Sequence, residues 1–246
     1  MANRASGAFK MVGWMNRLRR GVSVMFGRFN RIMKPWVLTV DYLTLHWKRE
    51  PYVYSDGDFG RNSTLELVAR EISDHNVEGA VAELGVYRGN FAKVINKAFP
   101  ERKLYLFDTF EGFDSNELKG DKEMGFSTED FAFTDTNVEI VMKKMTFPEN
   151  IIVKKGFFPE TAKDVDERFA FVSIDVDLYD PILAGLKFFY ERLNDGGYIF
   201  VHDYQCSHYL GVKVAVHEFC KENNIPFVPI SDVSGTVVIA KPISEA

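Results

Sequence analysis

The first residues with chemical potential surround two glycines in the string Glu83-Leu-Gly-Val-Tyr-Arg-Gly89. Gly85 and Gly89 can bring the backbone close to a ligand or adopt a positive φ. Their GxxxG spacing differs from the GxGxxG pattern that cradles a pyrophosphate, which makes a nicotinamide dinucleotide the weaker option. A carboxylate at Glu83 would repel a phosphate and instead suits a cationic group in a cofactor.

A second carboxylate follows the next apolar run of the chain. Asp108 lies 25 residues after Glu83, at the end of the predicted strand 103–108. An acidic side chain in that place can accept hydrogen bonds from both hydroxyls of a ribose. The two acids together therefore favour a cofactor that carries a positive charge and a ribose, and S-adenosylmethionine meets both requirements.

Two further polar segments, 174–180 and 201–204, follow later apolar runs. Because both would lie at the carboxyl edge of one sheet, Asp175, His202 and Asp203 can converge above the cofactor pocket. Two carboxylates and an imidazole, with room for water, suit a divalent cation such as Mg²⁺, whereas acids without a counter-charge would repel one another. The pattern therefore favours a metal site.

The same segments also have a structural interpretation. Asp177 and Asp180 could cap the helix that begins near Pro181, and this role is favoured for Asp180. His202 could be a buried histidine whose hydrogen bonds are satisfied within the protein. The residue types favour the metal for the two flanking carboxylates and leave both interpretations open for His202.

An α/β body must position these residues. From residue 61 onward, short apolar runs alternate with amphipathic segments of helix length, which is typical of a doubly wound, mostly parallel sheet with helices on both faces. Residues 61–74 should form a helix capped by Asn62 or Ser63. We expect parallel strands at 79–85, 103–108, 151–155, 169–174 and 198–202, the last after a turn at 194–197, and an antiparallel C-terminal hairpin at 227–230 and 236–240.

One long stretch, 111–133, lacks a clear helix or strand pattern. It carries seven acidic residues against two lysines. Irregular segments of this length in compact domains are usually functional covers or disordered. We expect this one to cover the site.

Residues 1–60 form a separate, basic part of the 246-residue chain. The first 50 residues hold ten Lys and Arg against two acids, a net charge of +8, so the rest of the chain carries −13. An acidic body repels polyanions, which argues against nucleic acid as a partner. Apolar residues recur at three- and four-residue steps and predict an amphipathic helical extension: Met11, Met15, Leu18, Val22, Met25, Phe29 and Ile32.

This extension has two interpretations. Its apolar face could pack on the body or on another subunit of a homo-oligomer, or residues 8–36 could lie in the headgroup region of a membrane with Trp14 and Trp36 at the interface. The chain has neither a run of about 18 apolar residues nor the pattern of a signal peptide. We therefore expect a cytoplasmic protein, with peripheral membrane association as the alternative.

The order of these motifs resembles the TylF-type macrocin O-methyltransferase family over roughly residues 60–241. The resemblance implies a class I methyltransferase fold with seven strands, for a domain that would occupy 61–246. It further implies methyl transfer from S-adenosylmethionine to a hydroxyl of a sugar or related natural-product group, with a divalent metal. The matching segments are 81–89 (VAELGVYRG), 107–113 (FDTFEGF), 156–161 (GFFPET), 174–179 (IDVDLY), 196–204 and 211–213 (GVK).

The same resemblance implies roles for individual residues. Those that would hold or flank the cofactor are Glu83, Gly85, Tyr87, Gly89, Asp108, Thr109, Phe110, Phe157 and Asp175. Those that would hold the metal are Asp175, His202 and Asp203. Family members often have two adjacent acids where this chain has His202 followed by Asp203, and the resemblance does not explain the first 60 residues.

Transfer to a hydroxyl also needs a group that removes its proton. Asp177 is the first candidate for this base and His208 is the second. Two other functions stay open: a non-catalytic methyltransferase-fold protein that binds at a membrane biosynthetic complex, and a nicotinamide-dependent oxidoreductase. The acid pair at Asp175 and Asp203 argues against the former, and NADH binding would favour the latter.

Overall fold

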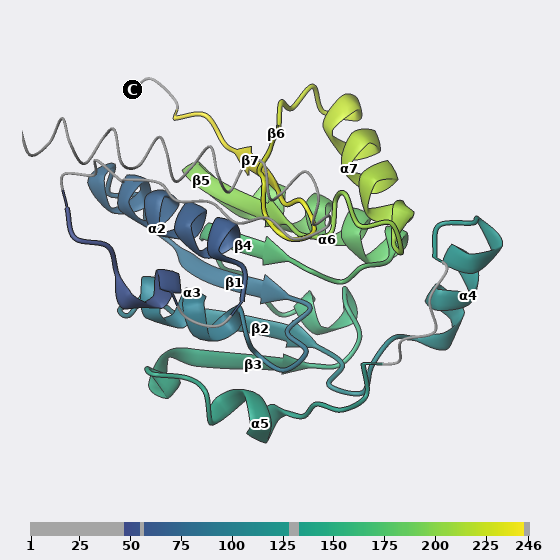
Figure 1. The fold of residues 1–246 in the computed structure, drawn as a ribbon, viewed down its shortest axis with the longest axis horizontal. Helices are drawn as coiled ribbons and strands as arrows, with labels where there is room; N and C mark the ends of the chain where they lie inside the picture. The colour runs from purple at the N-terminus through teal and green to yellow at the C-terminus, as the bar shows by residue number, and fades with distance from the viewer. Residues whose placement is uncertain (1–46, 55–56, 128–132, 244–246) are drawn as a thin grey trace, which may run out of the picture. The chain divides into compact units, whose positions relative to one another are not determined.

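The computed structural model describes residues 47–54, 57–127 and 133–243 (Figure 1). The chain divides into two units, Met1–Arg49 and Glu50–Ala246, and the description below concerns the second. The amphipathic helix predicted within residues 8–36 lies outside the described residues. In the part that the structure describes, no helix has both the length and the apolar character needed to cross a membrane.

A seven-stranded sheet forms the centre of the body, with the strand order β3-β2-β1-β4-β5-β7-β6. Strands β1 to β5 pair parallel with one another, and β7 pairs antiparallel with both β5 and β6. This confirms the predicted fold class, including the C-terminal hairpin. The bounds are β1 Ala80–Leu84, β2 Leu104–Asp108, β3 Ile151–Lys155, β4 Phe169–Ile174, β5 Leu193–Val201, β6 Val228–Pro229 and β7 Val237–Ala240.

The order of the strands reverses between β1 and β4. From β1 the chain adds β2 and then β3 on one side, and it then returns to add β4 and β5 on the other side. Every residue of β1 and β4 is buried, and apart from Glu83 and Ser173 their sequences are apolar, as expected for strands covered on both faces. In sheets of this kind, the reversal point opens a crevice at the carboxyl ends of the strands, where ligands bind.

Helices cover both faces of the sheet and divide the core into two layers. Leu65 and Ile72 of α2 pack with α3 residues on one face, while Leu186 of α6 and Val216 of α7 pack on the other. The α-helices are α2 Phe59–Asp74, α3 Ala92–Ala98, α4 Ser115–Glu123, α5 Val138–Met142, α6 Tyr179–Arg192 and α7 Leu210–Glu222. The short 3-10 helices are η1 Pro51–Tyr54, η2 Pro148–Asn150 and η3 Glu160–Ala162.

The start of α2 differs from the prediction. Its N-cap is Asp58, whose Oδ1 accepts hydrogen bonds from the backbone N–H groups of Gly60 and Arg61 at 2.8 and 3.3 Å. The predicted cap Asn62 is instead a buried helical residue. The body also begins before residue 61, because Tyr52 and Val53 of η1 are buried in the same core layer as α2.

The predicted turn at 194–197 is wrong, because these residues belong to β5. Leu193 pairs with Phe169 of β4, and the register shifts between Phe169 and Phe171. Gly196 has a φ of 78°, which lets the strand absorb this irregularity. Residues 194–197 therefore form an irregular insertion within β5, between the pairs that Leu193 and Tyr198 make with β4.

The acidic stretch 111–133 contains a helix that the sequence pattern did not predict. Asp114 caps α4 by accepting the N–H groups of Asn116 and Glu117 at 2.8 and 3.2 Å. Asp121, which is buried, accepts the N–H of Tyr179 at the start of α6 at 3.1 Å. Figure 1 shows α4 beyond the carboxyl ends of the strands, on the side where the reversal point opens.

Candidate active site

A cavity of about 540 Å³ lies at the reversal point of the sheet. Glu83, Asp108 and Asp175, which come from the ends of three adjacent strands, all line it. The other predicted site residues in its wall are Gly85, Tyr87, Thr109, Phe157, Asp177, His202, Asp203 and His208. The acids that the sequence placed at neighbouring strand ends thus share one cavity.

Two predicted cofactor residues do not line this cavity. Phe110 is only 3% exposed and packs in the core layer that contains α2. A Cβ on Gly89 would meet Val141 of α5 at 2.8 Å, so this glycine, with a φ of 69°, allows close packing of α5 rather than close approach of a ligand. Their predicted contact with a cofactor is therefore not supported by the structure.

Gly85 joins the two halves of the cavity floor. Its φ is 85°, and a Cβ there would lie 2.1 Å from the carbonyl oxygen of Asp175. The N–H of Asp175 also donates to the carbonyl of Leu84 at 2.8 Å. The absent side chain thus lets the ends of β1 and β4 approach each other.

Glu83 is a buried acid with an unused acceptor. Its side chain is 1% exposed, and its Oε2 has no hydrogen-bond partner among the described residues. Burial raises the pKa of Glu83 well above its ordinary value, and the Arg61 guanidinium opposes that rise. A buried acceptor facing a cavity calls for a donor or a cation from a ligand.

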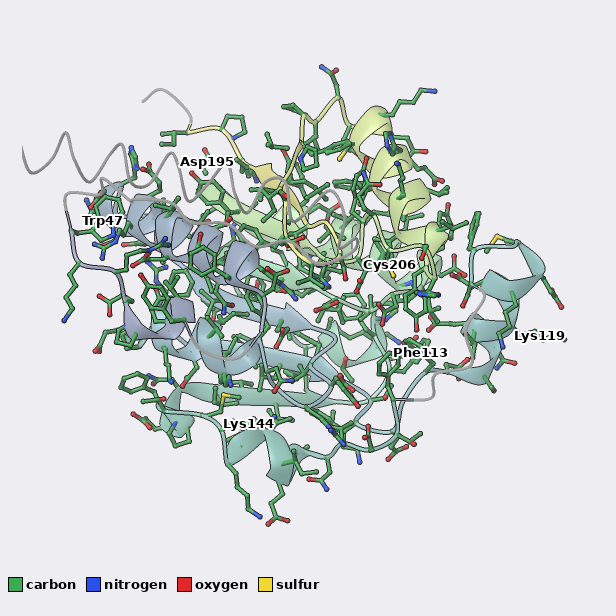
Figure 2. The ribbon with its side chains drawn as sticks, viewed as in Figure 1. Trp47, Phe113, Lys119, Lys144, Asp195 and Cys206 are labelled. Atoms are coloured by element: carbon green, nitrogen blue, oxygen red, sulfur yellow. The ribbon has the colours of Figure 1, made fainter. Side chains whose placement is uncertain are left out.

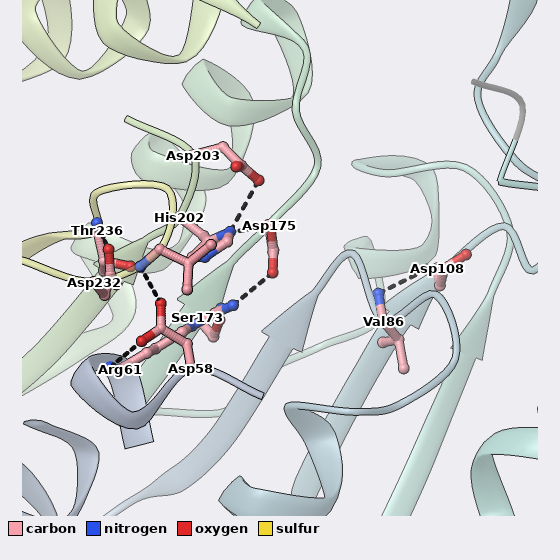
Figure 3. Close-up of polar contacts among 11 residues, drawn as sticks. Asp58, Arg61, Val86, Asp108, Ser173, Asp175, His202, Asp203, Asp232 and Thr236 are labelled. Atoms are coloured by element: carbon pink, nitrogen blue, oxygen red, sulfur yellow. Dashed lines mark hydrogen bonds and ion pairs between the residues drawn. The ribbon is translucent and has the colours of Figure 1, made fainter. Parts of the chain in front are cut away.

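Asp108 shapes the loop that follows β1. Its Oδ2 accepts the N–H group of Val86 at 2.6 Å (Figure 3) and that of Tyr87 at 2.8 Å, and its Oδ1 accepts the N–H of Phe110 at 2.6 Å. Tyr87 has a φ of 47°, so the loop folds tightly around the carboxylate. Asp108 therefore already accepts three hydrogen bonds from the backbone. The sequence predicted only hydrogen bonds from a ribose for this carboxylate.

Asp175, His202 and Asp203 come together as predicted. The Nδ1 of His202 lies 3.1 Å from Oδ1 of Asp175 and 2.9 Å from Oδ2 of Asp203 (Figure 3). One ligand atom from each of the three residues lies within 4.8 Å of the others. Asp58 and Asp232 also place an oxygen within 4.8 Å of a ring nitrogen of His202. The imidazole thus lies among four carboxylates.

This surrounding charge shifts the acid–base properties of the group. Burial lowers the pKa of His202, but the negative charge of Asp175 and the hydrogen bonds that the imidazole donates to Asp175 and Asp203 raise it to about 10. Burial opposes ionisation of Asp175, yet the positive charges of His202 and Arg61 hold its pKa below the ordinary value. Burial, together with Asp203 and Asp175, raises the pKa of Asp177 well above the ordinary value.

Arg61 is the main site residue that the sequence analysis missed. Its Nη1 donates to Oδ2 of Asp175 at 2.8 Å and its Nη2 donates to Oγ of Ser173 at 2.7 Å. The guanidinium also lies 3.7 Å from the centre of the Phe91 ring. A signal was present, because Arg61 precedes Leu65 by four residues and so shares the inward face of α2.

Residues 133–136 contact the loop that follows β1. The hydroxyl of Tyr87 donates to Asp135 at 2.5 Å, Arg88 forms an ion pair with Asp135, and Oγ1 of Thr136 donates to the carbonyl of Tyr87. The Phe133 ring packs edge-on against Tyr87 with centroids 5.1 Å apart. The stretch expected as a cover thus ends against the loop that contains Gly85.

Comparison with known proteins agrees with this architecture. The family profile described as macrocin-O-methyltransferase (TylF) matches residues 57–241. One relative is the 8-demethyl-8-(2,3-dimethoxy-alpha-L-rhamnosyl)-tetracenomycin-C 4'-O-methyltransferase of Streptomyces olivaceus. It is 25% identical over 72% of this chain and 71% of its own. The mycinamicin III 3''-O-methyltransferase of Micromonospora griseorubida is 28% identical over 67% of this chain and 68% of its own.

Solved structures share the fold. The O-methyltransferase NovP superposes with a TM-score of 0.61 at 22% identity, over 75% of this chain and 80% of its own. The calicheamicin methyltransferase CalS11, described elsewhere as a TDP-rhamnose 3'-O-methyltransferase, gives 0.59 at 18% identity, over 73% and 78%. Because the family profile covers most of the chain and the architecture agrees, this protein belongs to the TylF macrocin-O-methyltransferase family.

Proposed function

We propose that this protein transfers a methyl group from S-adenosylmethionine to a hydroxyl of a sugar, carried by a natural product or a glycolipid precursor. Membership of the family makes it an S-adenosylmethionine-dependent O-methyltransferase. The names of two relatives describe O-methylation of sugar-bearing compounds, which supports the sugar acceptor. The structural observation that carries the proposal is the buried Oε2 of Glu83 in the wall of the cavity, which has no hydrogen-bond partner in the part of the chain that the structure describes.

The residues of the cavity fit this cofactor. The buried carboxylate of Glu83 suits a cationic part of S-adenosylmethionine, because each of these two opposite charges would otherwise be buried without a partner. The loop around Asp108 would approach the nucleoside, and Oδ1 of Asp108 accepts only one backbone N–H, so it can accept a ribose hydroxyl as well. Thr109 and the partly exposed Phe157 line the same cavity and would flank the nucleoside.

The donor set at the other side of the cavity fits a divalent cation, and we propose Mg²⁺. Asp175, His202 and Asp203 would hold it, because they offer two carboxylate oxygens and a nitrogen within 4.8 Å of one another, and His202, whose pKa is raised to about 10, would lose its proton when the ion binds. Bound there, the ion would lower the pKa of an acceptor hydroxyl. Arg61 already contacts one oxygen of Asp175, so the protein itself supplies part of the positive charge at this point.

The protein's own contribution to the reaction is positioning and proton removal. Methyl transfer is an in-line displacement at a sulfonium carbon, so holding the acceptor oxygen close to that carbon supplies much of the rate. Asp177 is the proposed base because it lines the cavity beside Asp175 and Asp203, and His208, in the same wall, is the second candidate.

A binding and turnover experiment tests this function. Calorimetry should show that the protein binds S-adenosylhomocysteine and does not bind NADH. Labelled methyl groups should then pass from S-adenosylmethionine to members of a set of glycosides, and not to the same compounds with their hydroxyls blocked. Binding without transfer to any glycoside would favour the non-catalytic alternative, and binding of NADH instead would favour an oxidoreductase.

Assembly and location stay predictions. We propose a cytoplasmic homo-oligomer whose residues 8–36 pack on protein, with contact to an anionic membrane surface as the alternative. Light scattering of the full chain measures the oligomer. Sedimentation with vesicles of anionic and neutral lipid, compared with a chain in which Arg17, Arg20, Arg28 and Arg31 are replaced by glutamine, measures the membrane contact.

A further inference from the structure

The β6–β7 loop, residues 230–236, lies beside the candidate active site. Ser234 of this loop lines the cavity. The loop is fixed to the start of α2, because the N–H of Val233 donates to Oδ2 of Asp58. The two segments also pack closely, since a Cβ on Gly60 would meet the carbonyl oxygen of Ser231 at 2.8 Å. The loop therefore keeps a fixed position relative to α2 and the cavity.

Asp232, in this loop, has one oxygen whose role is explained and one whose role is not. Its Oδ1 accepts the N–H of Thr236 at 2.8 Å and so closes the turn (Figure 3). Its Oδ2 is buried and has no hydrogen-bond partner among the described residues. A buried acceptor without a donor destabilises a fold, and asparagine or serine could close the same turn. The turn therefore does not account for a carboxylate at this position.

The imidazole of His202 has the complementary arrangement. Its Nδ1 lies between Asp175 and Asp203, whereas no hydrogen bond joins its Nε2 to another residue in the described part of the chain. An oxygen of Asp232 lies within 4.8 Å of a ring nitrogen of His202, a distance that a direct contact or one bridging water covers. In the view of Figure 3, Asp203 and Asp232 lie on opposite sides of His202. Because Nδ1 already faces two carboxylates, the Nε2–H is the donor left for Asp232.

Asp58 also places an oxygen within 4.8 Å of a ring nitrogen of His202, but its oxygens have other partners. Its Oδ1 accepts the N–H groups of Gly60 and Arg61, and its Oδ2 accepts that of Val233. These contacts cap α2 and hold the β6–β7 loop. Oδ2 of Asp232 has no such task, which makes Asp232 the better acceptor for the imidazole.

We propose that Asp232 is a positioning residue for His202. Its Oδ2 accepts the Nε2–H, directly or through one water, and this contact directs Nδ1 toward Asp175 and Asp203. The inference rests on the proposed function, in which His202 is one of the metal ligands. A carboxylate on the second nitrogen of such a histidine fixes the orientation of the ring and strengthens the first nitrogen as a ligand. The C-terminal hairpin thus acts on the site through a residue that does not line the cavity.

Asp232→Asn separates this role from that of the turn. The amide oxygen can still accept the N–H of Thr236, but the amide nitrogen in place of Oδ2 cannot accept a hydrogen bond. The control is Asp195→Asn, which removes an exposed charge near the start of β5, the strand that ends just before His202. Figure 2 shows Asp195 toward the amino ends of the strands and Cys206 toward the carboxyl ends.

Nitrogen-15 NMR of the metal-free protein reports the contact directly. We expect the Nε2–H of His202, assigned by its absence in His202→Gln, to exchange slowly with water in the wild type and in Asp195→Asn. This signal should disappear in Asp232→Asn, whereas a role in the turn alone would leave it unchanged. Should Asp232→Asn not fold, Asp232→Ser takes its place, because serine can also close the turn. Absence of the signal in the wild type, or its persistence in the folded variant, would overturn the inference.

Metal affinity measures the consequence for the site. The probe is Mn²⁺, which suits carboxylate ligands as Mg²⁺ does, and calorimetry follows its binding to protein loaded with S-adenosylhomocysteine. We expect the affinity to fall about tenfold in Asp232→Asn and to change by less than about threefold in Asp195→Asn. Unchanged Mn²⁺ affinity in folded Asp232→Asn would contradict the positioning role. If the wild type binds no Mn²⁺, the metal proposal itself fails, and the NMR signal still decides whether Asp232 holds His202.

Discussion

Replacing Arg61 by methionine tests whether the cavity floor depends on one buried guanidinium. The change removes the donors to Asp175 at 2.8 Å and Ser173 at 2.7 Å while keeping a side chain of similar length. Removing one partner of a buried ion pair costs about 3–5 kcal/mol, because the other charge is left uncompensated. Asp175 would keep its contact with His202, so we expect the lower end of that range, about 3 kcal/mol in the free energy of unfolding.

Urea denaturation followed by circular dichroism measures this cost. Arg61→Lys keeps the charge but cannot reach both partners with a planar fork, so it should lose roughly half as much. Lys143→Met is the surface control: its ion pair with Glu139 is 72% and 77% exposed, and its loss should cost less than about 0.5 kcal/mol. A loss below about 1 kcal/mol for Arg61→Met, with the same dependence on urea concentration, would refute the reasoning.

Three further predictions follow from the same geometry. Glu83→Gln should weaken binding of S-adenosylhomocysteine at least tenfold in calorimetry, and unchanged affinity would remove this acid from the cofactor site. Asp175→Asn, Asp203→Asn and treatment with a chelator should each lower kcat strongly. The affinity for S-adenosylhomocysteine should change by less than about threefold, as expected for groups that act on the acceptor. Full activity in excess chelator would contradict the proposed role of the metal. Burial raises the pKa values of Glu117 and Asp121 to about 7 and about 6. The unfolded chain releases these protons near pH 4, before the folded protein does, so the free energy of unfolding should fall as the pH rises from about 4 to about 7. Glu117→Gln and Asp121→Asn should flatten that slope, and an equally steep slope in both variants would contradict the assignment.

The sheet could be predicted because its strands have little local ambiguity. The β4 sequence Phe169–Ile174 is short, apolar and buried throughout, which in an alternating α/β chain indicates a central parallel strand. By contrast, α4 has no apolar stripe, since its nine residues are mainly polar and it is held by the cap at Asp114 and the contact of Asp121 with α6. A helix stabilised by such contacts leaves no periodic signal in the sequence.

The candidate site was predictable where topology determines position. Glu83, Asp108 and Asp175 end adjacent strands, and parallel strands bring such ends to one edge. What the sequence could not show is how these acids are used. The contact of Arg61 with Asp175 joins residues 114 apart in the chain, and the three backbone N–H groups around Asp108 arise from a loop conformation rather than from a motif.

The contact between Gly85 and the carbonyl of Asp175 has a mechanical consequence. The peptide of Gly85, at the end of β1, and the peptide of Asp175, at the end of β4, touch without an intervening side chain. A shift of one must therefore displace the other. In the proposed arrangement, rigid main chain sets the spacing between methyl donor and acceptor, and adaptation to acceptors of different size falls to the wall near α4, where Asp121 accepts the N–H of Tyr179 of α6.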